Sequence, residues 1–566
     1  IPVLTTMIAT TIRIERFFNE SWNTFAVPEK PVLKDAKDFK ILGKPASRPD
    51  LKWKVTGAPI FGIDKSVAGM AFASVERCPV FGGKLKKVDD SAAKKVKGVQ
   101  KIVVAERVFG RNKWPVVAVI ADNYWAALKG RKALKIDWDF GGNNRFNSKD
   151  YEKKVHELAE TEGILHTETG NFDKALALNP TFLKAFYETP FVSHSPMEPM
   201  NCLAQWTGDN LELWLSHQAP DWMLEDLTKQ FSIKKENIKI NIAFSGGGFG
   251  RRLFPDVACE AASIAKLAGK PVKVIWTRED DTQQGPFRPP TFSKMTAAIS
   301  PEKTIAAWSH KVISPSIDQT FGDNFDATKP DGTMMEATNE QAYEIPNLKT
   351  QFVLAETQVP LGYWRAVTST TTAFAHECFF DEMAELAGRD PMEFRLAHLT
   401  KDSSAKRILL KLKEVTDWDS SNKNGRKLGV AQWEFFAGHA GTVVEVAKKA
   451  DNSVKIVKIW TVIDLGTVVN PDTVRAQVEG AAAMALTAAT KNGITFENGR
   501  AAQSNFHDNP MLRFNEMPPV EVHILAEGGE KIKGVGEPGL PPVAPALANA
   551  IFAATGRRIR RMPFEL

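Results

Sequence analysis

The sequence of 566 residues contains little cysteine, and its few cysteines are widely spaced. They are Cys78, Cys202, Cys259 and Cys378. This spacing leaves no C-x-x-C pair that could bind zinc, an iron–sulfur cluster or a redox disulfide. We therefore expect a fold that forms without disulfides. If the chain takes part in electron transfer, we expect the electrons to leave through a group held elsewhere.

Long hydrophobic runs and a strong net charge are also absent. The longest apolar stretches, residues 1–12 and 543–556, are shorter than the roughly 18 residues that suggest a membrane span. We therefore expect no transmembrane helix in this chain. The 73 Lys and Arg against 67 Asp and Glu give a net charge of +6, which is too weak a field to indicate a nucleic-acid partner.

Two further patterns are missing. No fixed-period repeat is found, which argues against a solenoid. The ten histidines show neither H-x-H nor H-x-x-x-H spacing, so we expect no metal ion to be held by protein ligands alone.

The sequence begins with Ile and lacks a basic leader region. We expect that any targeting segment has been removed or lies outside this sequence.

The composition, with 43% hydrophobic and 25% charged residues, is that of a soluble globular protein, and the length favours several lobes. Short β-branched runs alternate with helical patterns, which predicts an α+β (mixed α/β) fold. Residues 1–50 form a Pro- and Lys-rich arm or linker, and residues 51–145 a compact α/β unit. Two larger α+β lobes follow, over residues 146–410 and 411–566.

Local signals mark several helix ends in this arrangement. A helix over residues 122–134 is expected to have Asp122 as its N-cap. Two other helices are expected to end at Gly269 and at Gly388. Residues 396–427 are charged and rich in Ser and Asn, which predicts a surface connection.

A G-x-G-x-x-G pattern occurs at residues 534–539. Pro538 removes a backbone N–H donor there, and arginines stand where a dinucleotide site would have an acidic residue, so a nicotinamide site is disfavoured. The segment does hold one carboxylate, Glu537, between glycines and prolines. This placement favours a catalytic base. A helix cap or a surface ion pair remains an alternative for Glu537.

A second glycine-rich segment, SGGGFGRR, covers residues 245–252. Its run of unobstructed N–H groups suits an oxyanion, an oxo ligand or a phosphate. The Lys-Ser/Thr pair of a nucleoside triphosphatase loop is missing. The alternative is an ordinary glycine-rich turn.

Six segments together carry a resemblance to a known family: residues 197–202 (MEPMNC), 216–220 (SHQAP), 246–252 (GGGFGRR), 363–367 (YWRAV), 534–556 and 556–564. From about residue 36 onward the chain resembles the molybdopterin-binding large subunit of the xanthine oxidase family of molybdenum hydroxylases. It is most similar to the isoquinoline 1-oxidoreductase β-subunit branch, which includes aldehyde-oxidising members. The resemblance implies a hammerhead-like domain over residues 51–145 and a cofactor buried between the lobes 146–410 and 411–566.

The resemblance also implies roles for individual residues. Glu537 corresponds to the catalytic general base, Gln218 to a glutamine close to the metal, and Arg365 to an arginine of the substrate region. An ion pair with Glu377 or Asp381 is the alternative for Arg365. Molybdenum itself is held by the pterin dithiolene. The residues implied in cofactor binding are Gly247, Gly248, Phe249, Gly250, Arg251, Gln477, Gln503, Ser504, Asn505 and Gly536.

A chain of this kind is expected to oxidise an aldehyde or an N-heteroaromatic compound with water as the oxygen source. The implied cofactor is molybdopterin with molybdenum, as the cytosine dinucleotide, with no iron–sulfur cluster in this chain. The implied partners are a small [2Fe–2S] subunit and a cytochrome c subunit beyond it. The expected location is the bacterial cell envelope, periplasmic or peripheral to the membrane, with the cytoplasm as the alternative.

Aromatic residues near these motifs predict an apolar funnel for a flat or alkyl substrate, with core packing as the alternative for each. They are Phe191, Trp222, Phe249, Phe287, Tyr363 and Trp364. His194, His217 and His507 are expected to be structural.

Two departures from the branch leave an alternative function open. Asn509 stands where the branch usually has an aromatic residue, and residues 1–30 show no Gly-Gln-Gly stretch. The alternative is a non-catalytic or cofactor-poor homologue that serves as a structural subunit.

Overall fold

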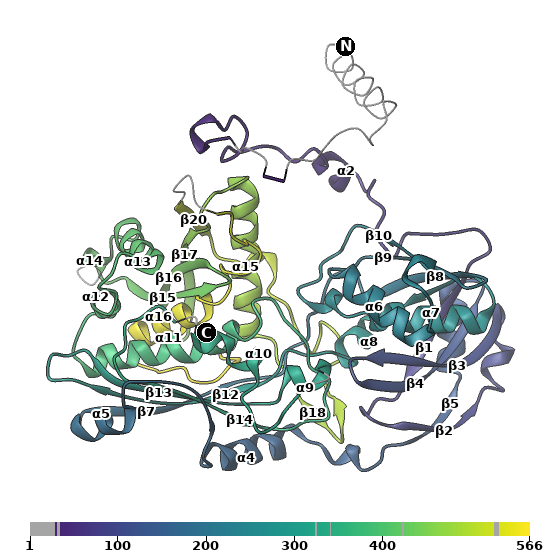
Figure 1. Ribbon diagram of the computed structural model, residues 1–566, viewed down its shortest axis with the longest axis horizontal. Helices are drawn as coiled ribbons and strands as arrows, with labels where there is room; N and C mark the ends of the chain where they lie inside the picture. Colours follow the sequence, from purple (N-terminus) through teal and green to yellow (C-terminus); the bar gives the residue numbers. More distant parts are fainter. Residues whose placement is uncertain (1–28, 31–33, 323–324, 340, 422–423, 526–530) are drawn as a thin grey trace.

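The computed structural model describes residues 29–30, 34–322, 325–339, 341–421, 424–525 and 531–566. Most of the predicted arm, residues 1–28 and 31–33, lies outside this range. Helices and sheets are mixed throughout, which confirms the predicted α+β class. Figure 1 shows two halves, one built on a seven-stranded sheet and the other on a four-stranded sheet with its helices.

The seven-stranded sheet is covered on both faces by helices. Helix α7 (Asp256–Ala268) packs against β3 and β8, and α3 (Tyr124–Lys132) packs against β1 and β4. Strands buried on both faces are continuously apolar rather than alternating, as in the VVAVIA run of β4. The strands in spatial order are β10 (Ile238–Ile242), β9 (Asn210–Leu215), β8 (Asn201–Thr207), β11 (Val272–Ile275), β1 (Ala71–Arg77), β4 (Asn112–Ala121) and β3 (Val99–Phe109).

This sheet crosses the boundary that the sequence places at residue 145. Strand β1 pairs in parallel with β11, with Ala71 opposite Val272. Residues of both segments share one buried apolar cluster. The apolar pattern of a strand shows that it is buried but not which distant strand it pairs with, so the sequence could not reveal this.

The other half contains two sheets with helices between them. Helix α16 (Val543–Thr555) packs on β15 and β16, and α11 (Ser369–Leu386) lies between α16 and strands β7 and β12. The four-stranded sheet runs β15 (Lys427–Phe435), β16 (Gly438–Lys448), β17 (Val454–Asp464) and β20 (Val520–Leu525). The five-stranded sheet runs β6 (Ile164–Thr169), β14 (Leu348–Leu354), β13 (Ile305–Ser314), β12 (Thr291–Ile299) and β7 (Phe182–Thr189).

Two local predictions were wrong. The N-cap of α3 is Asn123 rather than Asp122, because the Asn123 side chain accepts the Ala126 N–H. The predicted surface connection over residues 396–427 contains helix α13 (Ser404–Val415). Its apolar residues recur with helical spacing and lie in the core, namely Ala405, Ile408, Leu409 and Leu412. The charged residues that suggested a connection occupy the outer face of this helix.

The predicted helix ends at Gly269 and Gly388 are confirmed. Both glycines have left-handed backbones, with φ of +71° and +65°, which is the usual conformation just after a helix. None of the described helices is long and apolar enough to span a membrane. The remaining elements used below are α6 (Pro220–Phe231), α9 (Ile317–Phe321), α10 (Gly332–Met335), η7 (Glu336–Asn339) and α15 (Pro471–Thr490).

Gly429 allows a close contact between strand β15 and helix α16. A β-carbon at this position would lie 2.1 Å from the Ala550 nitrogen and 2.3 Å from the Ala546 oxygen. Both are backbone atoms of α16, so a side chain here would push the helix away from the sheet. Helix α16 directly follows the loop that carries Glu537, so a shift of the helix would also move the end of that loop.

Replacing Gly429 with Ala is expected to lower the free energy of unfolding by about 1–3 kcal/mol, because overpacking shifts α16. Gly480→Ala is the matched control, since Gly480 is exposed in the middle of α15. That change should raise stability by about 0.5–1 kcal/mol through helix propensity. Chemical denaturation of both variants measures the difference. Equal stability of Gly429→Ala and the unaltered protein would contradict the proposed contact.

Candidate active site

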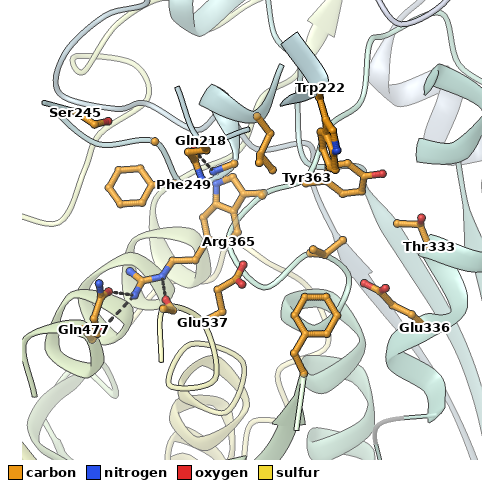
Figure 2. Close-up of a pocket in the computed structure, with 17 residues that line it drawn as sticks. Gln218, Trp222, Ser245, Phe249, Thr333, Glu336, Tyr363, Arg365, Gln477 and Glu537 are labelled. Atoms are coloured by element: carbon orange, nitrogen blue, oxygen red, sulfur yellow. Dashed lines mark hydrogen bonds between the residues drawn. The ribbon is translucent and has the colours of Figure 1, made fainter. Parts of the chain in front are cut away.

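A cavity of about 670 Å³ lies where the two halves meet (Figure 2). Its size is within the usual range of ligand sites. Its walls come from α6, the glycine loop after β10, the α10–η7 segment, the turn before α11, the β15–β16 hairpin, α15 and the loop before α16. The lining residues include Gln218, Trp222, Gly248, Phe249, Gly250, Thr333, Glu336, Tyr363, Trp364, Arg365, Phe436, Gln477, Gly536 and Glu537.

The glycine loop requires its glycines. Gly247 and Gly250 have φ of +96° and +101°, which side-chain-bearing residues rarely adopt. A β-carbon at Gly248 would lie 2.3 Å from Oε1 of Gln218. The Gly250 N–H donates to the same Gln218 oxygen at 3.3 Å. The loop is therefore a shaped cradle joined to Gln218 rather than an ordinary turn.

Arg365 connects three segments of the cavity wall. Its Nε donates to the Gly536 oxygen at 2.7 Å, and its Nη2 donates to Oε1 of Gln477 at 3.0 Å. Its backbone N–H donates to the Phe249 oxygen at 3.0 Å. Burial lowers the pKa of Arg365 to about 10, although the negative charge of Glu537 raises it, so the guanidinium stays charged at neutral pH.

The alternative partners considered for Arg365 are engaged elsewhere. Glu377 accepts from Arg395 at 3.0 Å in a fully buried ion pair. Asp381 pairs with Arg395 and with Arg558. Arg365 therefore does not form the structural ion pair that the sequence left open.

Glu537 is held by a turn with an unusual backbone. Its Oε1 accepts the Ala366 N–H at 2.8 Å. Ala366 and Val367 have φ of +64° and +42°, and a left-handed β-branched residue is a strained conformation that often marks a functional site. The N-cap position of α16 is Pro542, so Glu537 does not cap that helix. Figure 2 shows its carboxylate directed into the cavity beside Arg365.

The structure places some of the implied cofactor residues away from this cavity. Arg251 is buried and donates to both carboxylate oxygens of Asp256, at 2.8 and 2.9 Å. Its guanidinium thus forms a structural ion pair with Asp256. Asn505 donates to Glu279 at 2.7 Å, and the Ser504 N–H donates to Asp508.

Gln503 belongs to a different hollow. Its Oε1 accepts the Thr495 N–H at 2.8 Å, and it lines a second cavity of about 290 Å³ together with Lys491, Asp508 and Arg561. Asn509 is buried nearby and donates to Ser193 at 3.2 Å. The substitution at this position therefore does not change the wall of the main cavity.

The aromatic residues divide between the cavity and the core. Trp222, Phe249, Tyr363 and Trp364 line the cavity. Phe191 and Phe287 lie in a buried apolar cluster instead. The funnel prediction thus holds for four of the six residues, and core packing accounts for the other two.

His194 and His217 are not suited to proton transfer at neutral pH. His194 and His217 are buried, and burial lowers the pKa of each to about 4. His194 contacts the Tyr363 oxygen at 2.7 Å and His217 the Phe254 oxygen at 3.2 Å. His507 lies on the surface beside Asp508.

Four cavity residues were not anticipated from the sequence, and one of them, Leu253, directly follows the glycine-rich segment. Thr333 and Glu336 come from the short α10–η7 segment, and Phe436 from the β15–β16 hairpin. None belongs to a motif with recognisable spacing. Only the tertiary fold brings them to the site.

The cavity fits the molybdopterin group that the resemblance implies. The cradle at Gly248 has no room for a side chain, and its N–H groups with the Gln218 amide are neutral donors suited to oxygen ligands. Among the described residues, no cluster of three or more His, Cys, Asp or Glu side chains could hold a metal ion.

Comparisons with known proteins agree with this geometry. Residues 155–399 and residues 365–518 both match the molybdopterin cofactor-binding domain. The β subunit of isoquinoline 1-oxidoreductase from Brevundimonas diminuta is 30% identical over 551 residues, covering 94% of this chain and 69% of the relative. A membrane-bound aldehyde dehydrogenase of Gluconacetobacter polyoxogenes is 29% identical, and the match covers 94% of this chain and 73% of that relative.

Solved structures support the same fold. The aldehyde oxidoreductase of Desulfovibrio desulfuricans superimposes with a TM-score of 0.79 at 16% identity, over 95% of this chain and 80% of that one. The fold, the matched domains and the relatives agree with the resemblance seen in the sequence. The chain therefore belongs to the molybdopterin-binding large subunits of the xanthine oxidase family of molybdenum-dependent oxidoreductases.

Proposed function

We propose that this chain is the catalytic subunit of a molybdenum hydroxylase that oxidises an aldehyde or an N-heteroaromatic compound, with water as the oxygen source. The observation that carries this proposal is the placement of Glu537. Its carboxylate is half-buried in the cavity, with one oxygen fixed by the Ala366 N–H. The relatives named for isoquinoline oxidation and for aldehyde dehydrogenation support the substrate classes.

Glu537 acts as the general base. When bound, the molybdenum cofactor supplies the two-electron oxidation of a substrate carbon. The Ala366 N–H holds Oε1 of Glu537, which leaves Oε2 to take up a proton as oxygen from water is transferred. A positioned base of this kind typically contributes about 10²- to 10⁴-fold to the rate.

Other residues of the cavity wall would hold the cofactor and position Glu537. The Gly247–Gly250 loop, Gln218 and Gln477 would hold the cofactor through neutral donors, which adds no charge to the site. Arg365 positions Glu537, because it bonds the oxygen of the preceding residue, Gly536.

The nucleotide form of the cofactor is also a proposal. We assign it as the cytosine dinucleotide form, whose nucleotide part would be held by residues of the second cavity such as Gln503. We further propose that this chain holds no iron–sulfur cluster. All four cysteines are buried, and burial raises the pKa of each thiol, which disfavours the thiolate form that binds iron.

The electrons from the oxidised substrate must then pass to an acceptor in another subunit. We propose a small [2Fe–2S] subunit, and a cytochrome c subunit beyond it, in the bacterial cell envelope. Support comes from a relative that is itself a β subunit and from another described as membrane-bound. The electron partner and the location stay predictions.

The walls of the cavity favour flat, apolar substrates. Trp222, Tyr363 and Trp364 line it with aromatic surface, and Tyr363 stacks on Phe254 at 6.0 Å between ring centroids. Reading the polar edges of a purine would need fixed donors and acceptors in addition to these aromatic rings. Aldehydes and simple heteroaromatics are therefore expected to be better substrates than xanthine.

Replacing Glu537 with Gln should lower kcat by about 10²- to 10⁴-fold, because an amide cannot take up the proton. Molybdenum content should stay unchanged, since the contacts that hold the cofactor remain. Glu479→Gln, an exposed carboxylate on α15, is the matched control and should keep full activity. Steady-state assays with metal analysis measure both. Full turnover by Glu537→Gln would show that another group is the base.

A panel of benzaldehyde, acetaldehyde, isoquinoline and xanthine tests the substrate class. The aromatic walls predict the highest kcat/KM for benzaldehyde or isoquinoline and the lowest for xanthine. A clear preference for xanthine would refute the proposed apolar funnel.

A further inference from the structure

A buried ion pair adjoins the glycine loop of the cavity. Oε2 of Glu198 lies 3.1 Å from Nη2 of Arg252, and the two side chains are 6% and 0% exposed. Glu198 belongs to the MEPMNC segment, and Arg252 ends the glycine-rich segment. Neither is among the described residues that line the main cavity, so the site itself assigns them no role.

The pair holds the first half of the glycine loop by hydrogen bonds. Oε2 of Glu198 accepts the Gly246 N–H at 2.9 Å, and the Glu198 N–H donates to the Gly246 oxygen at 3.0 Å. Nε of Arg252 donates to the Gly247 oxygen at 2.6 Å. A β-carbon at Gly246 would lie 2.3 Å from the β-carbon of Glu198. The loop therefore lies directly against Glu198, and both residues of the pair bond its backbone.

The same pair joins the segment of Gln218 to the loop. The Ser216 hydroxyl donates to Oε2 of Glu198 at 3.3 Å. The Gln218 N–H donates to the Arg252 oxygen at 2.8 Å. Three of the six segments that carry the family resemblance thus meet at one ion pair. The two neutral donor groups of the cavity, the glycine loop and Gln218, are both tied to it.

The negative charge of Glu198 stabilises this arrangement. Burial lowers the pKa of Arg252, and the charge of Glu198 raises it, so the carboxylate offsets part of the cost of burying the guanidinium. Oε1 of Glu198 accepts the Ile63 N–H at 3.1 Å and Nδ2 of Asn201 at 2.9 Å. Both carboxylate oxygens therefore accept hydrogen bonds. A neutral amide would offer one acceptor oxygen and would turn donors toward donors at the other position.

We propose that Glu198 is a positioning residue for the cofactor, which together with Arg252 fixes the glycine loop and Gln218 so that their donors stay arranged to hold the molybdopterin group. This inference rests on the proposed function and deepens it. Glu198 lies outside the cavity lining, so it acts through the loop and not on a reacting group. Contacts that orient the groups holding a metal site typically change affinity by about 10- to 100-fold when they are removed.

Hydrogen–deuterium exchange of Glu198→Gln tests the positioning directly. This variant keeps the shape of the side chain and removes its charge. Exchange in peptides covering residues 245–252 should become about tenfold faster, because the Gly246 N–H loses its charged acceptor. Glu377→Gln is the matched control, since it removes the same charge from a fully buried ion pair in the other half of the molecule. It should leave exchange in these peptides unchanged.

Retention of the cofactor gives a second readout. During dialysis of the holoenzyme, Glu198→Gln should lose molybdenum and pterin about 10- to 100-fold faster than the unaltered protein. Glu377→Gln should lose them at the unaltered rate. Turnover per bound molybdenum should stay close to that of the unaltered enzyme, because Glu537 and its bond to Ala366 remain. Exchange and cofactor loss in Glu198→Gln that equal those of Glu377→Gln would overturn the inference.

The outcomes separate this inference from the proposed function. Holoenzyme that retains its cofactor but oxidises neither aldehydes nor N-heterocycles would refute the proposed function, while exchange and cofactor loss would still decide the role of Glu198. If Glu198→Gln does not fold, Arg252→Lys decides instead. It keeps the positive charge and loses the bond to the Gly247 oxygen, so exchange over residues 245–252 should again be faster. Unchanged exchange in Arg252→Lys would overturn the inference.

Discussion

The hydrogen bonds of Arg365 are the interaction on which the site depends. Its guanidinium bonds the Gly536 oxygen and the Gln477 side chain, while its backbone N–H bonds Phe249. Through this one residue the glycine loop, helix α15 and the loop of Glu537 keep a common position. The next residue, Ala366, donates to Glu537. The proposed base, Glu537, is thus held both through its own loop, which Arg365 bonds at Gly536, and through its carboxylate, which Ala366 bonds.

Close backbone approaches make this arrangement possible. Gly248 lets the glycine loop lie against Gln218, and Gly429 lets strand β15 lie against helix α16. Whereas these glycines permit close contacts without strain, Val367 has a left-handed backbone, which strains a β-branched residue. Strain of this kind persists only where the surrounding contacts determine the conformation. Here those contacts are the bonds of Arg365 and Ala366 to the Glu537 loop.

Much of the fold and of the candidate site could be predicted from the sequence, and what was missed has physical causes. The glycines that end helices, and the carboxylate of Glu537 among prolines and glycines, are local signals in the sequence. The fold brings that carboxylate together with the glycine loop. Arg251 lies in the same motif but turns to Asp256, because a local pattern does not fix the direction of a long side chain. Glu336 has no motif and enters the site only through packing. Helix α13 was missed although its apolar spacing was present, since its charged outer face dominated the composition.

The most direct measurement of the central claim is diffraction from crystals of the holoenzyme at the molybdenum absorption edge. The account predicts an anomalous peak inside the cavity, bordered by Gln218, the Gly247–Gly250 loop and Glu537, with Arg365 still bonded to Gly536. A peak outside this cavity would contradict it, as would molybdenum-containing protein in which Glu537 has turned away from the metal.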